Sequence, residues 1–269
     1  MKVIAVCSHK GGVGKTTLSL NLGLSLARRG HRTLIVDLDP QGAIGLSLGR
    51  DRWGYGGLAE VLAGRLAPED ALVRTRMDTL QLLPIGRMQM RQSALFDRHM
   101  ESGEKLGAVL DALRDRFDMV VVDTPAGFGG ATMGALRNAT HMISPLAAEP
   151  LAMRGAPEVL ELAVWLRELE LPVELLGFVV TMVNYDDPQS VAVLNEARQR
   201  FGSEWLLETV IRRDPSFLEA SAAGVPLSLL RRQPPLVAAA FDQLAQELEI
   251  RMNREPAQVD DHEPVSLID

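Results

Sequence analysis

Two lysines flank a short glycine-rich stretch near the start of the chain, in the run Lys10-Gly11-Gly12-Val13-Gly14-Lys15-Thr16-Thr17. The run follows an apolar, strand-like segment at residues 3–6 and opens an apolar-periodic helix. Glycines let successive backbone N–H groups and a helix N-terminus approach a polyphosphate closely. Lys15 would supply a charge to the β and γ oxygens, and Thr16 a hydroxyl to Mg²⁺. The run therefore predicts a phosphate-binding loop that carries an extra lysine, Lys10.

Three aspartates are expected at strand ends, where ligands bind in open α/β sheets. Asp123 closes the apolar run at residues 119–122, which is the Walker B form, and a carboxylate there can hold Mg²⁺ directly or through water. Asp37 and Asp39 end a second run, and alternation with a period of two would put both carboxylates on one side of the chain. We expect the metal site to be formed by Thr16, Asp37 and Asp123.

The alternation of apolar runs with helical patterns indicates a doubly wound α/β fold, with a mostly parallel sheet flanked by helices. Continuous apolarity, as in Val120-Val121-Val122, favours strands that are covered on both faces. The expected strands are residues 3–8, 33–37, 80–84, 119–123, 141–145, 176–183 and 207–211. The expected helices are residues 17–29, 105–117, 157–170, 188–201 and 234–252, with a short one at 58–62 in the less regular stretch 49–102.

Length and composition favour one large soluble domain of residues 1–253, followed by an acidic, disordered tail at 254–269. The formal charge of −7 argues against a broadly basic nucleic-acid binder but leaves room for local basic patches. The single cysteine, Cys7, is expected to be a reduced packing residue. The start shows no leader, and no apolar run approaches the roughly 20 residues of a membrane span. We therefore expect a cytoplasmic protein without membrane insertion.

The last helix carries an apolar side chain at every fourth position, which predicts a stripe that faces the core. Its members are Leu236, Ala240, Leu244, Leu248 and Met252.

The lysine-first loop, the element Asp37-Leu38-Asp39-Pro40-Gln41 and the run Val122-Asp123-Thr124-Pro125 together resemble the ParA/MinD superfamily of deviant Walker A ATPases, over residues 1–252. The resemblance implies ATP and Mg²⁺ as cofactors and an ATP-bound sandwich dimer in which Lys10 reaches the phosphates of the other subunit. It also implies that Asp39 positions the attacking water, that Thr16 and Asp123 organise Mg²⁺, and that Asn184 contacts adenine. Slow, partner-stimulated hydrolysis is a further expectation.

Within that superfamily, the sequence resembles the ParA/Soj branch most. A single cysteine argues against the nitrogenase iron-protein branch, which needs two per subunit, and neither Tyr55 nor Tyr185 is terminal as in the tyrosine-kinase branch. The acidic end differs from the basic amphipathic helix of MinD. The ParA/Soj resemblance implies sequence-independent DNA binding in the ATP state, a nucleoid-associated location, and a ParB-like or cargo-adaptor protein that stimulates hydrolysis.

Basic residues in the C-terminal third are the candidates for DNA contact, by regional resemblance: Arg198, Arg200, Arg212, Arg213, Arg231 and Arg232. Such a surface would give salt-sensitive binding through phosphate contacts. Paired arginines are about as often solvated side chains or partners of carboxylates as they are DNA contacts. The alternative is therefore a regulatory ATPase that docks a protein partner, at a cell pole or a membrane-associated complex, without binding DNA. A metabolic amidoligase is a third reading, disfavoured because Lys10 suits dimer closure and no substrate domain is evident.

Overall fold

The computed structural model describes residues 1–42, 44–45, 48, 56–86, 88 and 90–253. The tail expected at residues 254–269 lies outside the described residues. Within them, the strands form one eight-stranded sheet in the order β3-β4-β2-β5-β1-β6-β7-β8. All neighbouring pairs are parallel except β3 with β4. The strands are β1 Lys2–Val6, β2 Thr33–Asp37, β3 Val73–Arg74, β4 Leu80–Leu83, β5 Met119–Asp123, β6 His141–Ala147, β7 Glu174–Val183 and β8 Leu206–Arg212.

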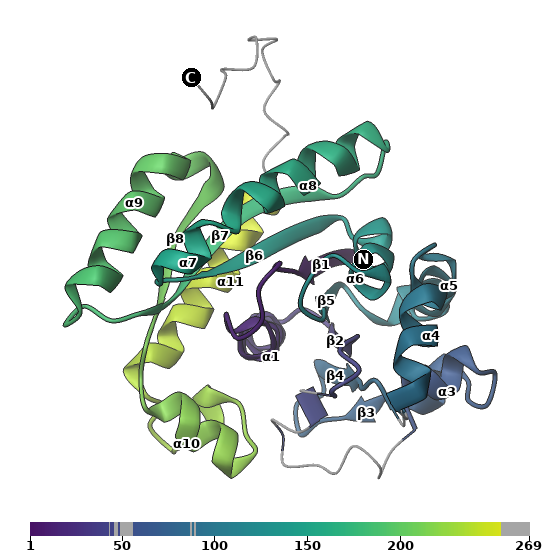
Figure 1. Ribbon diagram of the computed structural model, residues 1–269. Helices are drawn as coiled ribbons and strands as arrows, with labels where there is room; N and C mark the ends of the chain where they lie inside the picture. The colour runs from purple at the N-terminus through teal and green to yellow at the C-terminus, as the bar shows by residue number, and fades with distance from the viewer. Residues whose placement is uncertain (43, 46–47, 49–55, 87, 89, 254–269) are drawn as a thin grey trace.

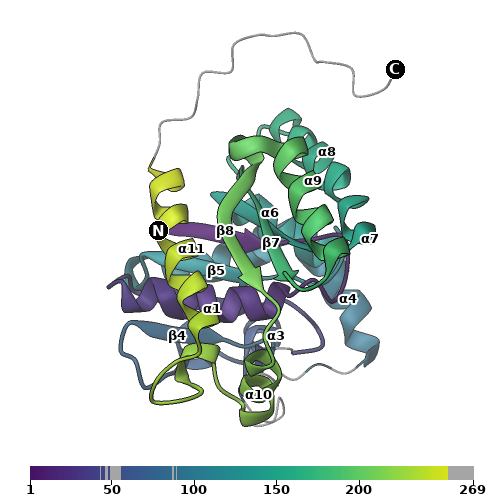
Figure 2. The same cartoon turned by 90° about the vertical axis from the view of Figure 1, so that its left-hand side faces the viewer.

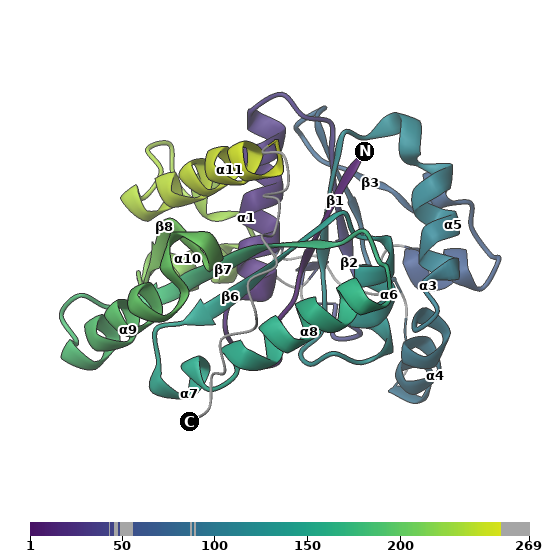
Figure 3. The same cartoon turned by 90° about the horizontal axis from the view of Figure 1, so that it is seen from above.

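Helices cover both faces of the sheet, and the views in Figures 1 and 3 agree on the layers. One face, called the first face below, packs against α4, α5, α6, α8 and α9. The opposite, second face packs against α1 and α11. The helices are α1 Lys15–Arg28, α3 Leu58–Leu62, α4 Met90–Met100, α5 Glu104–Ala112, α6 Gly130–Asn138, α7 Pro150–Met153, α8 Ala156–Glu168, α9 Pro188–Trp205, α10 Ser216–Ala223 and α11 Ala239–Met252.

The central strands are apolar at consecutive positions because both of their faces are buried. In β5, Val120 and Val122 pack into the core of the first face, whereas Val121 packs into the core of the second. All five residues of this strand are buried. The doubly wound, mostly parallel sheet predicted from the sequence is therefore confirmed.

Helix α1 joins the phosphate loop to the core of the second face, where it lies beside α11 (Figure 2). Leu18, Leu22 and Leu26, spaced one turn apart, are buried in this core. A Cβ at Gly23 would lie 2.5 Å from the side chain of Ile35 in β2, so glycine is needed for the close approach. The middle of α1 is thereby held against β2.

Several predicted elements differ from the structure. The helix expected at 105–117 ends at Ala112 and continues as a 3₁₀ turn at Arg114–Arg116. The helix expected at 234–252 begins only at Ala239, after the 3₁₀ turn Leu236–Ala238. The helical period does not extend into that turn, and Leu236 is 96% exposed rather than part of the core stripe. Leu244, Leu248 and Met252 are buried as predicted.

Five elements are not predicted by the sequence patterns: β3, α4, α6, α7 and α10. Helix α6 is the instructive case, because its small residues give a weak apolar pattern. A Cβ at Gly130 or Gly134 would overlap the backbone oxygens of Asp97 and Met100 in α4, so the two helices pack backbone to backbone. Asp97 also accepts the Ala131 N–H at 2.8 Å. Close packing, rather than large apolar side chains, therefore fixes α6.

Candidate nucleotide-binding site

The phosphate loop joins the end of β1 to α1 at the carboxyl edge of the sheet. Gly14 precedes the helix with a φ of 93°, a left-handed conformation that favours glycine. Gly11 and Gly12 are exposed, whereas Val13 is buried against the first face. Thr181 of β7 donates its hydroxyl to the Val13 oxygen at 2.9 Å. The loop is therefore anchored on β7 and open to solvent along its glycines.

Lys15 is buried at the first position of α1, with only 8% of the residue exposed. Its ammonium group donates to the backbone oxygen of Lys10 at 3.1 Å, which folds the loop around the amine. Burial lowers the pKa of Lys15, while the charges of Asp123 and Asp39 oppose that shift. The arrangement places a partly desolvated cation beneath the glycine loop, where it can neutralise phosphate oxygens.

Asp123 ends β5, and its backbone lies opposite Val6 of β1. One carboxylate oxygen, Oδ1, accepts the hydroxyl of Ser19 at 2.9 Å. The other, Oδ2, is buried and has no hydrogen-bond partner. Burial raises the pKa of Asp123 to about 7, an effect that the nearby hydroxyls of Thr16 and Ser19 reduce. A buried carboxylate oxygen without a donor fits a site that is completed by a cation or by a cation-bound water.

Asp37 and Asp39 do not share the geometry expected of them. Strand β2 ends at Asp37, so the two-residue alternation does not reach Asp39. The Asp37 carboxylate accepts the backbone N–H of Asp39 at 3.0 Å and that of Ile44 at 3.2 Å. Burial, followed by the nearby charge of Asp123, raises the pKa of Asp37 well above its ordinary value. Asp37 thus organises the loop after β2, while the half-buried Asp39 accepts the Gln41 N–H at 2.8 Å.

Among the described residues, no group of three or more His, Cys, Asp or Glu side chains is arranged to hold a metal ion. A Mg²⁺ ion at a phosphate loop takes one or two protein ligands and completes its shell with phosphate oxygens and water. Thr16 at the loop and the unpartnered Oδ2 of Asp123 are the groups suited to it.

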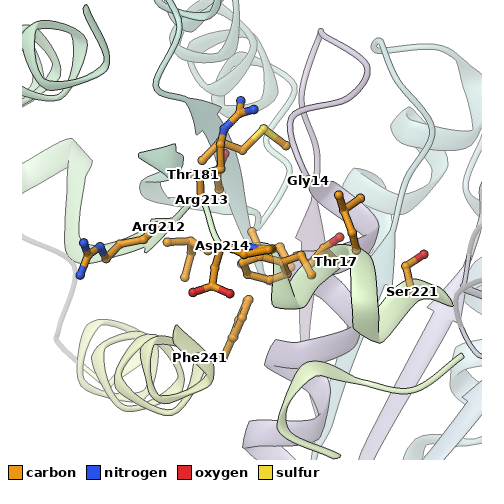
Figure 4. A pocket seen from close by; sticks show the side chains of 14 residues that line it. Gly14, Thr17, Thr181, Arg212, Arg213, Asp214, Ser221 and Phe241 are labelled. Carbon is orange, nitrogen blue, oxygen red and sulfur yellow. The ribbon is translucent and has the colours of Figure 1, made fainter. Parts of the chain in front are cut away.

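A pocket of about 580 Å³ opens beside the loop, between the start of α1 and the ends of β7 and β8 (Figure 4). Gly14 and Thr17 form its loop side, and Thr181 its sheet side. The far wall is mainly apolar, with Phe217, Leu218 and Phe241. Asp214 lies at this wall, just before α10, and accepts the Ser216 N–H at 2.8 Å. The pocket can receive a flat apolar group attached to a phosphate chain.

Asn184 follows β7 as predicted but does not line this pocket. Its side-chain oxygen accepts the Asp186 N–H at 3.1 Å, and its backbone N–H donates to Ser190 at 2.9 Å. These contacts make a turn before α9. Sequence analysis had not singled out Ile211 and Pro215, which do line the pocket. Their position at the carboxyl end of β8 (Ile211) and just after it (Pro215) was the available signal, since ligands bind at strand ends.

The candidate DNA-binding arginines come from three separate segments, and four of the six have intramolecular contacts. The guanidinium of Arg212 lies 4.8 Å from the ring centre of Tyr185, and that of Arg200 lies 5.8 Å from that of Phe201. Arg213 pairs with Glu149 at 3.3 Å, and Arg231 pairs with Glu219. Arg212 and Arg213 also line the pocket (Figure 4). Arg198 and Arg200 lie on α9, away from that pocket's lining.

Cys7 is fully buried between the end of β1 and the phosphate loop. Burial raises the pKa of its thiol to about 12. The side chain belongs to the core of the first face, as the sequence analysis expected. Separately, none of the helices in the described part of the chain is long and apolar enough to cross a membrane.

Proteins of known family are similar to this chain over nearly its whole length. Residues 1–170 match the AAA_31 family, described as an AAA domain. The chromosome partitioning protein ParA of Caulobacter vibrioides is 31% identical over 234 residues, which cover 85% of this chain and 87% of that protein. The chromosome-partitioning ATPase Soj of Thermus thermophilus is 35% identical over 255 residues, which cover 93% of this chain and 96% of that protein.

Solved structures agree with these relatives. The cell division ATPase MinD of Pyrococcus furiosus superimposes with a TM-score of 0.75 at 28% identity, over 93% of this chain and 98% of that chain. Cobyrinic acid a,c-diamide synthase from Mycobacterium smegmatis, solved with an ATP analogue and magnesium, gives a TM-score of 0.76 at 30% identity, over 94% of this chain and 96% of that chain. Fold, phosphate loop and relatives converge, and the chain belongs to the ParA/MinD superfamily of ATPases, with ParA and Soj proteins among its relatives.

Proposed function

We propose that this protein is an ATP-dependent, dimerising switch of the ParA type. In the ATP state it binds DNA without sequence preference, and it positions or segregates a chromosome, plasmid or cytoplasmic cargo. The observation that carries the proposal is the pairing of two lysines in one phosphate loop, with Lys15 buried beneath the loop and Lys10 at its outer end. One cation then serves the bound phosphates, and the other remains available to a second subunit.

ATP and Mg²⁺ are the cofactors that membership of the superfamily gives to this site. The triphosphate would lie against the N–H groups of residues 11–17, with Lys15 on the β and γ oxygens. Mg²⁺ would neutralise charge on those oxygens, held by Thr16 and by Asp123 directly or through water. Ser19 orients the Asp123 carboxylate through its 2.9 Å hydrogen bond. Asp37 supports the neighbouring loop instead of supplying an obvious metal ligand.

The adjoining pocket is proposed to take the adenine base. Its loop side, formed by Gly14 and Thr17, is continuous with the phosphate loop, and its apolar wall suits a flat heterocycle. Asn184 does not line this pocket, and its side-chain oxygen already accepts the Asp186 N–H. The residues after β8 are therefore stronger candidates for base contact than Asn184.

Hydrolysis is proposed to use Asp39 to orient the attacking water and Lys10 from the second subunit to stabilise charge on the transferred phosphoryl group. Asp39 is half-buried, and its charge acts on Lys15. A cation that arrives only with the second subunit makes hydrolysis depend on dimerisation. We propose that turnover is slow and that a ParB-like or cargo-adaptor protein stimulates it.

The alternative, an ATPase that docks a protein partner without binding DNA, is favoured by the contacts of the arginines. Arg213 and Arg231 are paired with carboxylates, which reduces the charge they offer to phosphates. Both ion pairs are more than half exposed on the arginine side, so they are weak enough for DNA phosphates to compete with them. The DNA-binding reading therefore remains the main proposal.

The two functions separate in a DNA cosedimentation experiment with a salt series. Wild-type protein is mixed with non-specific duplex DNA in the presence of ATP or ADP, beside Lys10→Ala and the quadruple variant Arg212→Glu, Arg213→Glu, Arg231→Glu, Arg232→Glu. ATP-dependent binding that weakens with salt and is lost in both variants supports the proposal. Light scattering on the same samples checks that the quadruple variant still dimerises.

Dimerisation on ATP without DNA association at any salt concentration would reject DNA binding and favour the partner-docking alternative. Absence of ATP-dependent dimerisation in the wild type would reject the switch itself. Glu161→Ala, an exposed substitution on α8 remote from the arginine pairs, serves as the unaltered control.

A further inference from the structure

One side chain of the phosphate loop has no role in the function proposed above. His9 directly precedes Lys10 and lies outside the glycine cradle. Its ring nitrogen Nδ1 donates to Oε2 of Glu158 at 2.8 Å. Glu158 belongs to the first turn of α8, on the first face of the sheet. The loop is thus connected to a helix that contributes nothing to the phosphate cradle.

The same ring contacts a second segment. The His9 and Phe128 rings lie edge to face, with centroids 5.8 Å apart and planes at 63°. Phe128 is in the loop that follows Asp123 and leads into α6, and it packs against the core of the first face. That loop is already tied to the start of the phosphate loop, because the Gly127 N–H donates to the Ser8 oxygen at 3.1 Å. His9 therefore joins three segments: the phosphate loop, the loop after β5 and α8.

Lys10 is held by the same surroundings. The start of α8 approaches it closely, since a Cβ at Gly155 would lie 3.7 Å from Cε of Lys10. Its backbone N–H and oxygen both lie 3.3 Å from the Ser8 hydroxyl oxygen, and its oxygen also accepts from Lys15. A lysine that must reach into another subunit needs its backbone fixed, because a small misplacement of a catalytic cation greatly reduces rate.

The His9–Glu158 pair contributes little to the stability of the fold. Both side chains are about half exposed, at 53% and 46%, and ion pairs of that exposure are worth between nothing and about 1 kcal/mol. What the pair does fix is orientation: the imidazole cannot keep both its carboxylate and its aromatic contact unless residue 9 stays in one conformation. The neighbouring peptide of Lys10 is restricted with it.

We propose that His9 is a positioning residue for Lys10, which couples the loop after Asp123 and the first turn of α8 to the lysine that acts on the second subunit. The inference rests on the proposed function, since it assumes that Lys10 acts across a dimer. A displacement of the loop after β5, next to the metal-associated Asp123, would be passed through Phe128 to His9 and on to Lys10. These contacts thereby connect the loop after Asp123 with Lys10.

The test compares His9→Ala, His9→Gln, Glu158→Ala and the double variant His9→Ala/Glu158→Ala with wild type. The affinity of the monomer for ATP is measured with a fluorescent ATP analogue. ATP-dependent dimerisation is measured by sedimentation, and kcat and KM by phosphate release. Glu161→Ala, one turn further along α8 and exposed, is the matched control. Circular dichroism melting verifies that each variant is folded.

We expect His9→Ala to weaken dimerisation and to lower kcat up to about fivefold, in line with the loss of one half-exposed ion pair, while the ATP affinity of the monomer and KM stay unchanged. His9→Gln should recover most of the loss, because its amide can donate to Glu158. The double variant should be no worse than His9→Ala alone, as required of two residues that act through one contact.

Three results would overturn the inference: dimerisation and kcat of His9→Ala equal to wild type, additive losses in the double variant, or a parallel loss of monomer ATP affinity. An equal loss in Glu161→Ala would also overturn it. If the wild type itself fails to dimerise on ATP, the proposed function and this inference fall together. If it dimerises and His9→Ala does too, only this inference fails.

Discussion

The ammonium group of Lys15 donates a 3.1 Å hydrogen bond to the backbone oxygen of Lys10, so the two lysines of the phosphate loop are directly connected. The contact leaves their side chains with different surroundings: Lys15 points beneath the loop, whereas the Lys10 side chain runs along Gly155. Their substitutions should therefore have different effects.

Lys15→Gln should lower the affinity of the monomer for ATP roughly 10- to 150-fold, which corresponds to the 1.5–3 kcal/mol typical of a hydrogen bond to a charged group. Lys10→Gln should bind ATP with wild-type affinity, because its side chain lies outside the cradle, yet fail to dimerise. Equilibrium titration with a fluorescent ATP analogue measures the ATP affinity of each variant, and sedimentation measures dimerisation. Equal losses in the two variants would contradict the separation of roles.

Ser19→Ala should weaken Mg²⁺-dependent ATP binding. The Ser19 hydroxyl is one of the donors that oppose the burial-induced rise of the Asp123 pKa, so its removal raises that pKa further and disfavours the carboxylate form. The free energy of unfolding should fall by about 1–3 kcal/mol, because Asp123 Oδ1 is left without a donor. Calorimetric titration with and without Mg²⁺ checks the first effect, and urea unfolding the second.

Ser25→Ala is the control for that experiment, because Ser25 is buried in the same helix but makes no contact with Asp123. A loss of Mg²⁺-dependent binding as large in Ser25→Ala as in Ser19→Ala would attribute the effect to α1 in general.

His141 should make the stability of the protein depend on pH. Burial, with a smaller contribution from the charge of Lys2, lowers the pKa of this histidine from 6.5 to about 4. Between those values the unfolded chain binds the proton and the folded chain does not, so the contribution of His141 is fully present above pH 6.5 and is lost as the pH falls toward 4. Each unit of pKa difference between the folded and unfolded states corresponds to roughly 1.4 kcal/mol of unfolding free energy.

Urea unfolding at several pH values tests this expectation with His141→Gln, which should flatten the dependence in that window. His99→Gln, at an exposed position of α4, should leave the slope of unfolding free energy against pH as in the wild type. A slope that is identical in wild type and His141→Gln would assign the pH dependence to other groups.

Leu248→Ala and Leu236→Ala should differ sharply in stability, although both leucines belong to the same stripe in the sequence. Leu248 is 0% exposed in the core of the second face, so truncation should cost about 2–5 kcal/mol. Leu236 is 96% exposed, and its truncation should stay within about 0.5 kcal/mol. Thermal and urea unfolding measure the pair, and similar losses would contradict the placement of Leu236.

The strands and the phosphate loop could be predicted because their signals are local. An apolar run such as 119–122 must be buried on both faces, and an aspartate after it must lie at the edge where the glycine loop of β1 also ends. The position of Asp123 next to the loop follows from these two facts alone. Ser19 could have been added by helical spacing, since it lies one turn after Lys15 and its hydroxyl oxygen is 2.9 Å from the Lys15 backbone oxygen.

The remaining features depend on contacts between distant segments. The apolar wall of the pocket combines Phe217 of α10 with Phe241 of α11, which no pattern in either helix indicates. The two oxygens of Asp37 are taken by amides of the loop after β2, and the course of that loop is not encoded in strand alternation. Helix α6 escaped prediction because its glycines are required by the backbone of α4 rather than by its own helical propensity.

The buried state of Cys7 makes this protein convenient for thiol chemistry. The chain has one cysteine, and a thiol with a pKa of about 12 and no exposed surface stays protonated and out of reach of maleimides at neutral pH. A cysteine introduced at an exposed position, such as Glu161 on α8, would then be the single reactive site of an otherwise native chain. A fluorophore or spin label placed there can follow subunit association directly, without first removing the native cysteine.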